Sequence, residues 1–162
     1  MSQTSVADEE SSPSAFPQAG IELSSDQYDE SPPRRLADTA AFLKAVVQAT
    51  IVLRWGSLER AVRRVKTRRA RLQGSQLFDI KRTRELVSVF TDLRPLLFTS
   101  REACLFESLV LLEFLACYGI FPRWIFGVRA RPFAAHCWVQ QGDVVLNDTL
   151  GHLARYTPIM MV

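Results

Sequence analysis

Three side chains in the C-terminal half of the chain, Cys104, His136 and Asp148, could together perform nucleophilic chemistry. A thiol, an imidazole and a carboxylate are the groups that a cysteine nucleophile, its base and the orienting residue require. A helix is expected to begin at Cys104, so unpaired backbone N–H groups and the helix dipole would favour its thiolate. Taken alone, a single cysteine is more often a small buried apolar residue than a nucleophile.

The spacing of His136 and Asp148 predicts that the two side chains meet across a β-hairpin. Gly142 marks a turn, and a three-residue loop at 141–143 places residue 136 directly opposite residue 148. The carboxylate would then hold one ring nitrogen and leave the other to accept the thiol proton. A shorter loop would turn the aspartate to the other face of the sheet. A hydrogen-bonded core histidine and a turn aspartate are the alternatives for each residue alone.

A fold in which helices precede strands must position these residues. Apolar side chains at helical spacing predict four helices, over residues 38–54, 58–72, 82–93 and 104–119. Asp38 and Ser57 are expected to begin the first two, and Gly119 to end the fourth. The apolar period then changes to two, which predicts strands over residues 124–130, 134–140 and 144–148. This order is typical of an α+β domain with an antiparallel sheet.

Charge is unevenly distributed along the 162 residues. Residues 1–33 contain seven acids and no lysine or arginine, whereas residues 34–94 contain fifteen basic residues against five acids. Residues 1–35 are rich in Ser, Pro, Asp and Glu and poor in large apolar side chains, so we expect a disordered acidic tail. The predicted domain therefore covers residues 36–162.

Composition argues against several classes of protein. The three cysteines are odd in number and form no Cys-x-x-Cys pair, which argues against a zinc site and a disulfide framework. The N-terminus is acidic and polar, unlike a secretory signal. The longest apolar stretch, residues 40–53, is shorter than the roughly 20 residues that a membrane span needs. We therefore expect a soluble, cytoplasmic protein with no cofactor, no metal and no membrane association.

Five segments of the chain carry a family resemblance: Cys104-Leu105-x-x-Ser108-Leu109, Phe126-Gly127-Val128-Arg129, Pro132-Phe133-x-Ala135-His136-x-Trp138-Val139, Val145-Leu146-Asn147-Asp148 and Tyr156-Thr157-Pro158-Ile159. In these segments the chain resembles the leader peptidases of lasso peptide biosynthesis, which are transglutaminase-like cysteine proteases. The resemblance covers about residues 36–162. Order, spacing and flanking residues agree together around His136 and Asp148.

This resemblance implies a transglutaminase-like (papain-like) fold and assigns the catalytic roles to Cys104, His136 and Asp148. It further implies a cysteine peptidase that cuts the leader from a precursor peptide through a thioester acyl-enzyme. The expected partners are the precursor peptide, a separate leader-recognition protein and an ATP-dependent lasso cyclase, but not nucleic acid. A catalytically silent scaffold that binds the leader peptide or the cyclase is the alternative, and amide transfer in place of hydrolysis stays open.

The chain departs from the family pattern at two places. Cys137 stands where the family usually has alanine, and strand alternation turns it away from the face of His136, where a small buried thiol is tolerable. Phe106 and Glu107 stand where the family often has a basic residue, which bears on substrate contacts and not on the three proposed catalytic residues.

Several other features have less defined roles. Cys117 is expected in the core, and His152 at the surface, because the sequence offers His152 no evident acidic or thiol partner. Trp138 either shields the site from water or packs in the core, and Ser108 either touches the site or makes a helix–helix contact. The basic helix 58–72 lacks interleaved aromatic residues, so a solvated face or a docking face for an acidic partner or leader peptide is favoured over nucleic acid.

Overall fold

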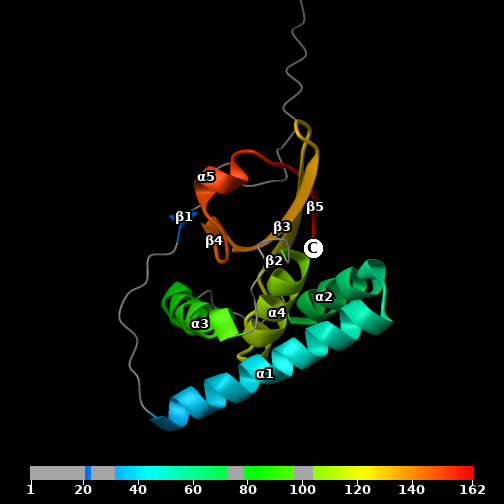
Figure 1. Cartoon of the computed structure of the whole chain (residues 1–162). Coiled ribbons are helices and arrows are strands. Elements are labelled where there is room, and N and C mark those ends of the chain that lie inside the picture. The colour runs from blue at the N-terminus through cyan, green and yellow to red at the C-terminus, as the bar shows by residue number, and fades with distance from the viewer. Residues whose placement is uncertain (1–20, 23–31, 73–78, 97–103) are drawn as a thin grey trace, which may run out of the picture.

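The computed structural model describes residues 21–22, 32–72, 79–96 and 104–162, which form an α+β fold. The elements in chain order are β1 (Ile21–Glu22), α1 (Pro32–Trp55), α2 (Leu58–Leu72), α3 (Ile80–Leu93), the 3₁₀ helix η1 (Arg94–Leu96), α4 (Cys104–Cys117), β2 (Arg123–Arg129), β3 (Ala134–Gln141), β4 (Val144–Val145), α5 (Leu150–Leu153) and β5 (Thr157–Met161). Figure 1 shows α1, α2, α3 and α4 gathered on one side of the sheet, with α4 closest to the strands. The predicted succession of helices and antiparallel strands is confirmed.

The first helix begins earlier than its sequence indicates. It starts at Pro32, and Asp38 lies inside it with 3% of its surface exposed. The Asp38 carboxylate accepts a hydrogen bond from the hydroxyl of Tyr118, so the predicted capping role of Asp38 is wrong. Proline suits a first helical turn, where the backbone N–H groups have no partner within the helix. Of the expected tail 1–35, only residues 21–22 and 32–35 are described, in β1 and α1, and the remainder lies outside the described residues.

Residues 35–55 of α1 are long and apolar enough to cross a membrane by length and composition, as core helices of soluble proteins also are. This segment is longer than the apolar stretch 40–53 counted from the sequence. One face of α1 packs into the domain, where Phe42, Ala45 and Ala49 are at most 1% exposed. The ring of Phe42 meets the rings of two buried phenylalanines edge-on, with centroid distances of 5.7 and 6.4 Å. This face of α1 therefore belongs to the core.

Local capping fixes the starts of α2 and α3. The hydroxyl of Ser57 accepts a hydrogen bond from the backbone N–H of Arg60 at 3.3 Å, as expected for the residue before α2. The carboxylate of Asp79 does the same for the backbone N–H of Arg82 at 3.0 Å. Because Asp79 is the cap, α3 begins at Ile80 and not at the predicted residue 82.

Gly119 ends α4 as predicted. It adopts a φ of 76°, and its N–H donates to the carbonyl of Ala116 at 3.2 Å, while the next N–H, of Ile120, donates to the carbonyl of Leu115 at 3.0 Å. This pair of bonds satisfies carbonyls that the helix itself leaves without partners. Cys117, at the last turn, is exposed, so its predicted core position is wrong.

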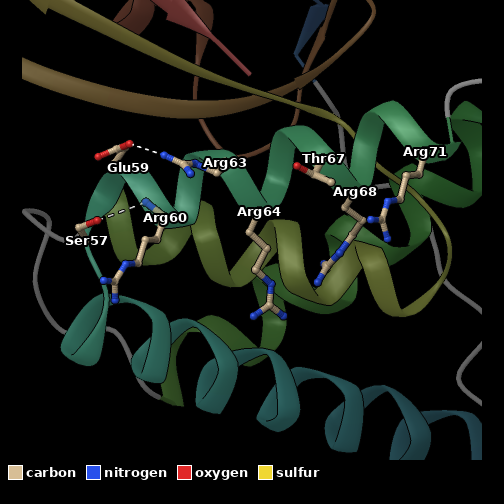
Figure 2. Close-up of a pocket in the computed structure, with 8 residues that line it drawn as sticks. All are labelled: Ser57, Glu59, Arg60, Arg63, Arg64, Thr67, Arg68 and Arg71. Carbon is tan, nitrogen blue, oxygen red and sulfur yellow. Dashed lines mark hydrogen bonds and ion pairs between the residues drawn. The ribbon is translucent and has the colours of Figure 1, made fainter.

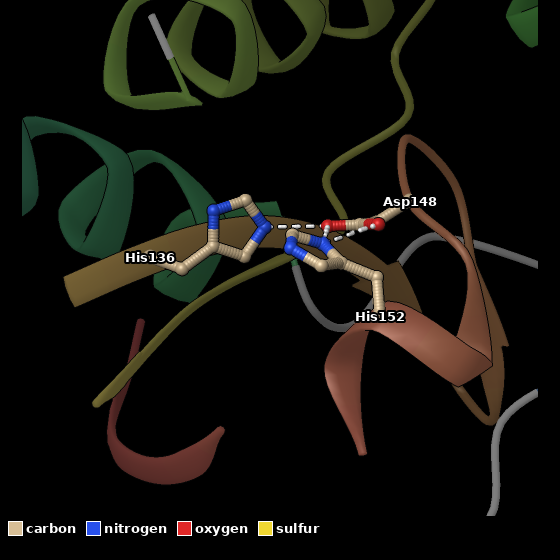
Figure 3. Close-up of side chains that lie close together, drawn as sticks. All are labelled: His136, Asp148 and His152. Carbon is tan, nitrogen blue, oxygen red and sulfur yellow. Dashed lines mark hydrogen bonds and ion pairs between the residues drawn. The ribbon is translucent and has the colours of Figure 1, made fainter. Parts of the chain in front are cut away.

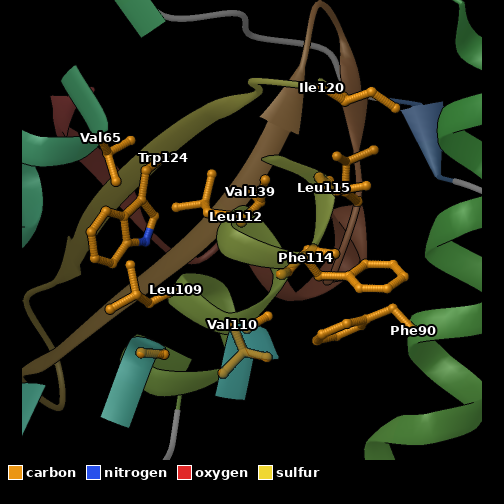
Figure 4. Packing of buried hydrophobic residues seen from close by; sticks show 14 of the residues in the cluster. Val65, Phe90, Leu109, Val110, Leu112, Phe114, Leu115, Ile120, Trp124 and Val139 are labelled. Atoms are coloured by element: carbon orange, nitrogen blue, oxygen red, sulfur yellow. The ribbon is translucent and has the colours of Figure 1, made fainter. Parts of the chain in front are cut away.

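The centre of the core is α4. Five of its apolar residues are at most 1% exposed, namely Leu109, Val110, Leu111, Phe114 and Leu115. Figure 4 shows Leu109 and Leu112 on the side of the sheet residues Trp124 and Val139, whereas Phe114 faces Phe90 of α3. Apolar side chains therefore cover more than one face of α4, because the helix packs against the sheet on one side and against α3 on another.

The sheet has the strand order β1-β4-β3-β2-β5. β1 runs parallel to β4, and the other neighbouring strands are antiparallel. β5 was not among the predicted strands. It carries Pro158, which lacks a backbone N–H, and such a residue is tolerated at a sheet edge, where β5 lies.

The hairpin that was expected to pair residues 136 and 148 has a different register. Gln140 pairs with Val145 and Gln141 with Val144, so the loop contains two residues, and Gly142 takes a φ of 57° there. β4 ends at Val145. The predicted strand 144–148 and the direct cross-strand pair of residues 136 and 148 are therefore both wrong.

Candidate active site

Cys104 is the first residue of α4, as its sequence predicts. Its thiol lies within hydrogen-bonding reach of Cys137 and His136. These two hydrogen bonds lower the pKa of the Cys104 thiol to about 4, although partial burial opposes the shift. The sulfur is therefore a thiolate at neutral pH, which is the nucleophilic form of cysteine.

Cys137 is the first of these two partners, and its own thiol donates to Ser108 Oγ at 3.8 Å. The hydrogen bond to Cys104 and then burial raise the pKa of the Cys137 thiol, so this cysteine keeps its proton at neutral pH. The Cys137 side chain is 2% exposed, so a small buried thiol is tolerated there as predicted. Sequence reasoning missed the contact with Cys104, because strand alternation says only which face a residue occupies and not what covers that face.

Asp148 is held by a loop and not by a strand. The side-chain oxygen of Asn147 accepts from the backbone N–H of Val139 at 2.8 Å, and its side-chain nitrogen donates to Ser108 Oγ at 3.2 Å. Ser108 Oγ donates in turn to the carbonyl of Cys137 at 3.1 Å. Ser108 thus joins α4 to β3 and to the loop after β4. The sequence left open whether Ser108 touches the site or contacts another helix. In the structure its hydrogen bonds go to a strand and to a loop, and not to another helix.

The predicted contact between His136 and Asp148 is present despite the different register. Nε2 of His136 lies 2.5 Å from Oδ2 of Asp148, and the two side chains are 15% and 11% exposed. Figure 3 shows the second ring nitrogen of His136 pointing away from Asp148, which leaves it for Cys104. Burial alone would lower the pKa of His136, but hydrogen bonds to Asp148 and Cys104 raise it to about 9. An imidazolium therefore faces a thiolate at neutral pH.

His152, expected at the surface without a partner, donates a hydrogen bond to the same carboxylate. Its Nδ1 lies 3.0 Å from both Oδ1 and Oδ2 of Asp148 (Figure 3). Thr149 Oγ1 caps the short helix α5 by accepting from the backbone N–H of His152 at 3.3 Å. This contact could have been predicted from the sequence, because Asp148 and His152 are four residues apart and a helical turn between them would bring the two side chains together.

Asp148 stays ionised because of these donors. Burial would raise the pKa of its carboxyl, but hydrogen bonds from His136, His152 and the backbone N–H of Thr149 lower it. The carboxylate accepts from that backbone group at 2.7 Å. Asp148 therefore presents a fixed negative charge to the histidine ring.

The same three side chains could hold a metal ion. One ligand atom from each of His136, Asp148 and His152 lies within 4.8 Å of the other two. Two imidazoles and a carboxylate are a donor set that suits zinc. An ion bound there would replace the hydrogen bond between His136 and Asp148, so the metal-bound and hydrogen-bonded arrangements exclude one another.

Aromatic rings fix the orientation of His136. The Trp138 ring, which belongs to a 3% exposed residue, is stacked on it at a centroid distance of 6.1 Å, and the Tyr156 ring lies at 5.1 Å. Gly127, the strand partner of His136, makes room for this arrangement, because a Cβ there would lie 2.9 Å from the Trp138 ring. Trp138 therefore both packs in a small core and covers the imidazole.

A cavity of about 260 Å³ lies beside Asp148, between α3, the first turn of α4 and the segment 145–149. Arg94 and Glu107 both line it and form an ion pair at 3.2 Å. Burial raises the pKa of Glu107, and Arg94 opposes that shift. Arg94 therefore offsets only part of the cost of burying the Glu107 carboxylate. A basic side chain is present in the cavity after all, but it comes from η1 and not from the turn that follows Cys104.

The structure thus brings together the three side chains that the sequence singled out, and adds Cys137 on one side and His152 on the other. In a comparison with known families, residues 28–161 match the family described as the transglutaminase-like superfamily. No curated protein and no solved structure matches the chain.

Proposed function

Since the chain belongs to the transglutaminase-like superfamily, we propose that it is a cysteine peptidase and that Cys104, His136 and Asp148 are its catalytic residues. One observation carries the proposal: the side chain of His136 lies between an ionised carboxylate and a thiol with a pKa of about 4. A cysteine in a purely structural role has no need of this arrangement. It is the order of groups that covalent acyl transfer requires.

The chemistry follows from the charges of the site. The Cys104 thiolate attacks the carbonyl carbon of a peptide bond, and the backbone N–H groups at the start of α4 stabilise the negative charge that develops on the oxygen. The His136 imidazolium then gives its proton to the leaving amine, while Asp148 holds the ring in place. Water, deprotonated by the neutral imidazole, cleaves the thioester and restores the thiolate. Trp138, which covers one face of the ring, limits access of bulk water to it.

The substrate we propose is the precursor of a lasso peptide, cut between leader and core in the cytoplasm. The segments around Cys104, His136 and Asp148 that resemble lasso leader peptidases support this assignment. A separate recognition protein would present the leader, and an ATP-dependent cyclase would use the freed N-terminus of the core. The protein itself uses no cofactor in this proposal.

The test is incubation of the full chain with precursor peptide and recognition protein, followed by mass spectrometry of the products. The Cys104→Ala variant is the matched control, because it removes the sulfur and leaves the start of α4 intact. Two fragments that appear only with Cys104 support the peptidase. A mass increase by an added amine supports amide transfer, and binding of the leader without any product supports a catalytically silent scaffold.

A further inference from the structure

The outer face of α1 is apolar and uncovered. Five side chains along it are between 52% and 81% exposed, namely Leu36, Leu43, Val47, Ile51 and Trp55. They recur at the spacing of one helical stripe, opposite the buried stripe of Phe42, Ala45 and Ala49. The stripe runs over about 28 Å at 1.5 Å per residue. Exposed apolar side chains scattered singly are ordinary, but a continuous stripe of this length marks a binding surface.

A groove lined by arginines follows this stripe in the chain. Trp55, at the end of α1, is followed shortly by Leu58, which is 43% exposed. The groove is lined by Ser57 and by residues of α2, namely Glu59, Arg60, Arg63, Arg64, Thr67, Arg68 and Arg71. Figure 2 shows Arg60, Arg64 and Arg68 extending from α2 toward α1. The groove therefore begins at the point where the apolar stripe ends.

Part of this positive charge is already compensated. Arg64 and Arg68 lie 3.5 and 2.9 Å from the carboxylate of Glu113, which is 2% exposed on α4. Arg63 pairs with Glu59 at 2.6 Å. Within the part of the chain that the structure describes, the side chains of Arg60 and Arg71 form no ion pair. They are the charges that remain for a partner.

We propose that the apolar stripe of α1 and the arginine groove of α2 form one docking face for an amphipathic helix of a second protein. That helix carries apolar side chains along one side, to cover Leu43, Val47 and Ile51, and carboxylates that enter the groove at Arg60 and Arg71. Helix-on-helix packing buries the stripe, and charge complementarity sets the direction of the partner. This docking face lies on the side of α4 away from the sheet (Figure 1), and its role does not depend on Cys104 being catalytic.

Chemistry disfavours the other occupants of such a face. Nucleic acid would satisfy the arginines but would leave the apolar stripe uncovered. A second copy packed through the same stripe would bring like charges together, because no carboxylate occurs between Asp38 and Glu59, whereas Lys44 and Arg54 lie in that span. An anionic membrane suits a stripe with a terminal tryptophan, but a flat surface cannot enter a concave groove.

The experiment measures binding of a fluorescently labelled, designed helical peptide to the full chain by fluorescence anisotropy. The probe has leucines on one side and glutamates flanking them, and its control has lysines in place of the glutamates. We expect the acidic probe to bind at least tenfold more tightly than the basic one, and more weakly as salt is raised. The variants Val47→Glu and Arg60→Glu should each lower the affinity for the acidic probe at least tenfold.

Lys66→Glu is the matched control, because it makes the same charge change as Arg60→Glu on the same helix but lies outside the groove residues. It should change the affinity less than twofold. Circular dichroism spectra that match those of the unaltered chain verify that each variant is folded.

Three results would overturn the proposal. The first is equal affinity for the acidic and the basic probe. The second is an equal loss of affinity for the acidic probe in Lys66→Glu and Arg60→Glu. The third is binding to vesicles of anionic lipid that is tighter than binding to the acidic probe and that Val47→Glu abolishes. Self-association that Val47→Glu removes, seen by analytical ultracentrifugation, would likewise replace the second protein by a second copy.

Discussion

The reactivity of Cys104 toward iodoacetamide at different pH values tests the site directly. An ordinary cysteine with a pKa of 9.0 is about one part in a thousand thiolate at pH 6, whereas a pKa of about 4 makes Cys104 almost wholly thiolate. A thiolate of lower pKa is also a weaker nucleophile. With a Brønsted coefficient of about 0.45, five pKa units reduce its intrinsic rate by about 200-fold. Cys104 should then react only about fivefold faster than an ordinary cysteine at pH 6.

The shape of the pH profile therefore discriminates better than the rate at one pH. The alkylation rate of Cys104 should be nearly constant from about pH 5 to pH 8 and fall below about pH 4, as the thiolate takes up a proton. An ordinary thiol would react about tenfold faster with each unit of pH over the same range. Mass spectrometry of the alkylated chain assigns the rate to Cys104, since Cys117 is also exposed to the reagent.

Two variants test whether the hydrogen bonds to Cys104 cause the pH profile of its alkylation. Cys137→Ala removes the hydrogen bond that contributes most to the lowered pKa of Cys104, and His136→Ala removes the other. Each should move the inflection toward higher pH, whereas Cys137→Ser, which keeps a donor, should move it less. A wild-type rate that rises tenfold per unit up to about pH 9 would refute the thiolate–imidazolium pair and, with it, the basis of the proposed mechanism.

Further predictions concern the groups around this pair. Peptide hydrolysis should lose activity below about pH 4 and above about pH 9, because the thiolate gains a proton at the lower limit and His136 loses the proton for the leaving amine at the upper one. The pH profile of kcat/KM checks both limits, since it reports the pKa values of the protein without substrate. His152→Ala should lower kcat by roughly tenfold or less with KM unchanged, since it leaves Asp148 with one imidazole donor, and His152→Gln should restore part of the loss. Gly127→Ala should lower the free energy of unfolding by about 1–3 kcal/mol, because its Cβ would meet the Trp138 ring, and thermal unfolding measures this. Zinc ions should inhibit the proposed peptide hydrolysis reversibly through His136, Asp148 and His152. A chelator should restore the activity, and His152→Ala should weaken the inhibition.

Some parts of the fold could be predicted because local chemistry decides them. α2 occupies the predicted residues 58–72, since Ser57 caps it and its apolar residues keep helical spacing. Gly119 ends α4 because a positive φ costs glycine little. The prediction for Asp38 was wrong because long-range packing, and not local chemistry, decided its partner. An aspartate has the chemistry of a cap, but its carboxylate accepts from the hydroxyl of Tyr118, which is far away in the chain.

The sequence by itself determined the chemical groups of the site, since Cys104 at a helix start and the segments around His136 and Asp148 are local features. Tertiary structure decided how those groups meet. The hairpin register would not have paired His136 with Asp148, and the contact exists because Asn147 binds both Val139 and Ser108 and so sets the path of the loop. Tertiary packing also brought Cys137 against Cys104, and the α5 turn brought His152 to Asp148. These contacts depend on distances between segments far apart in the chain or on a turn with no apolar periodicity, and a linear pattern carries neither.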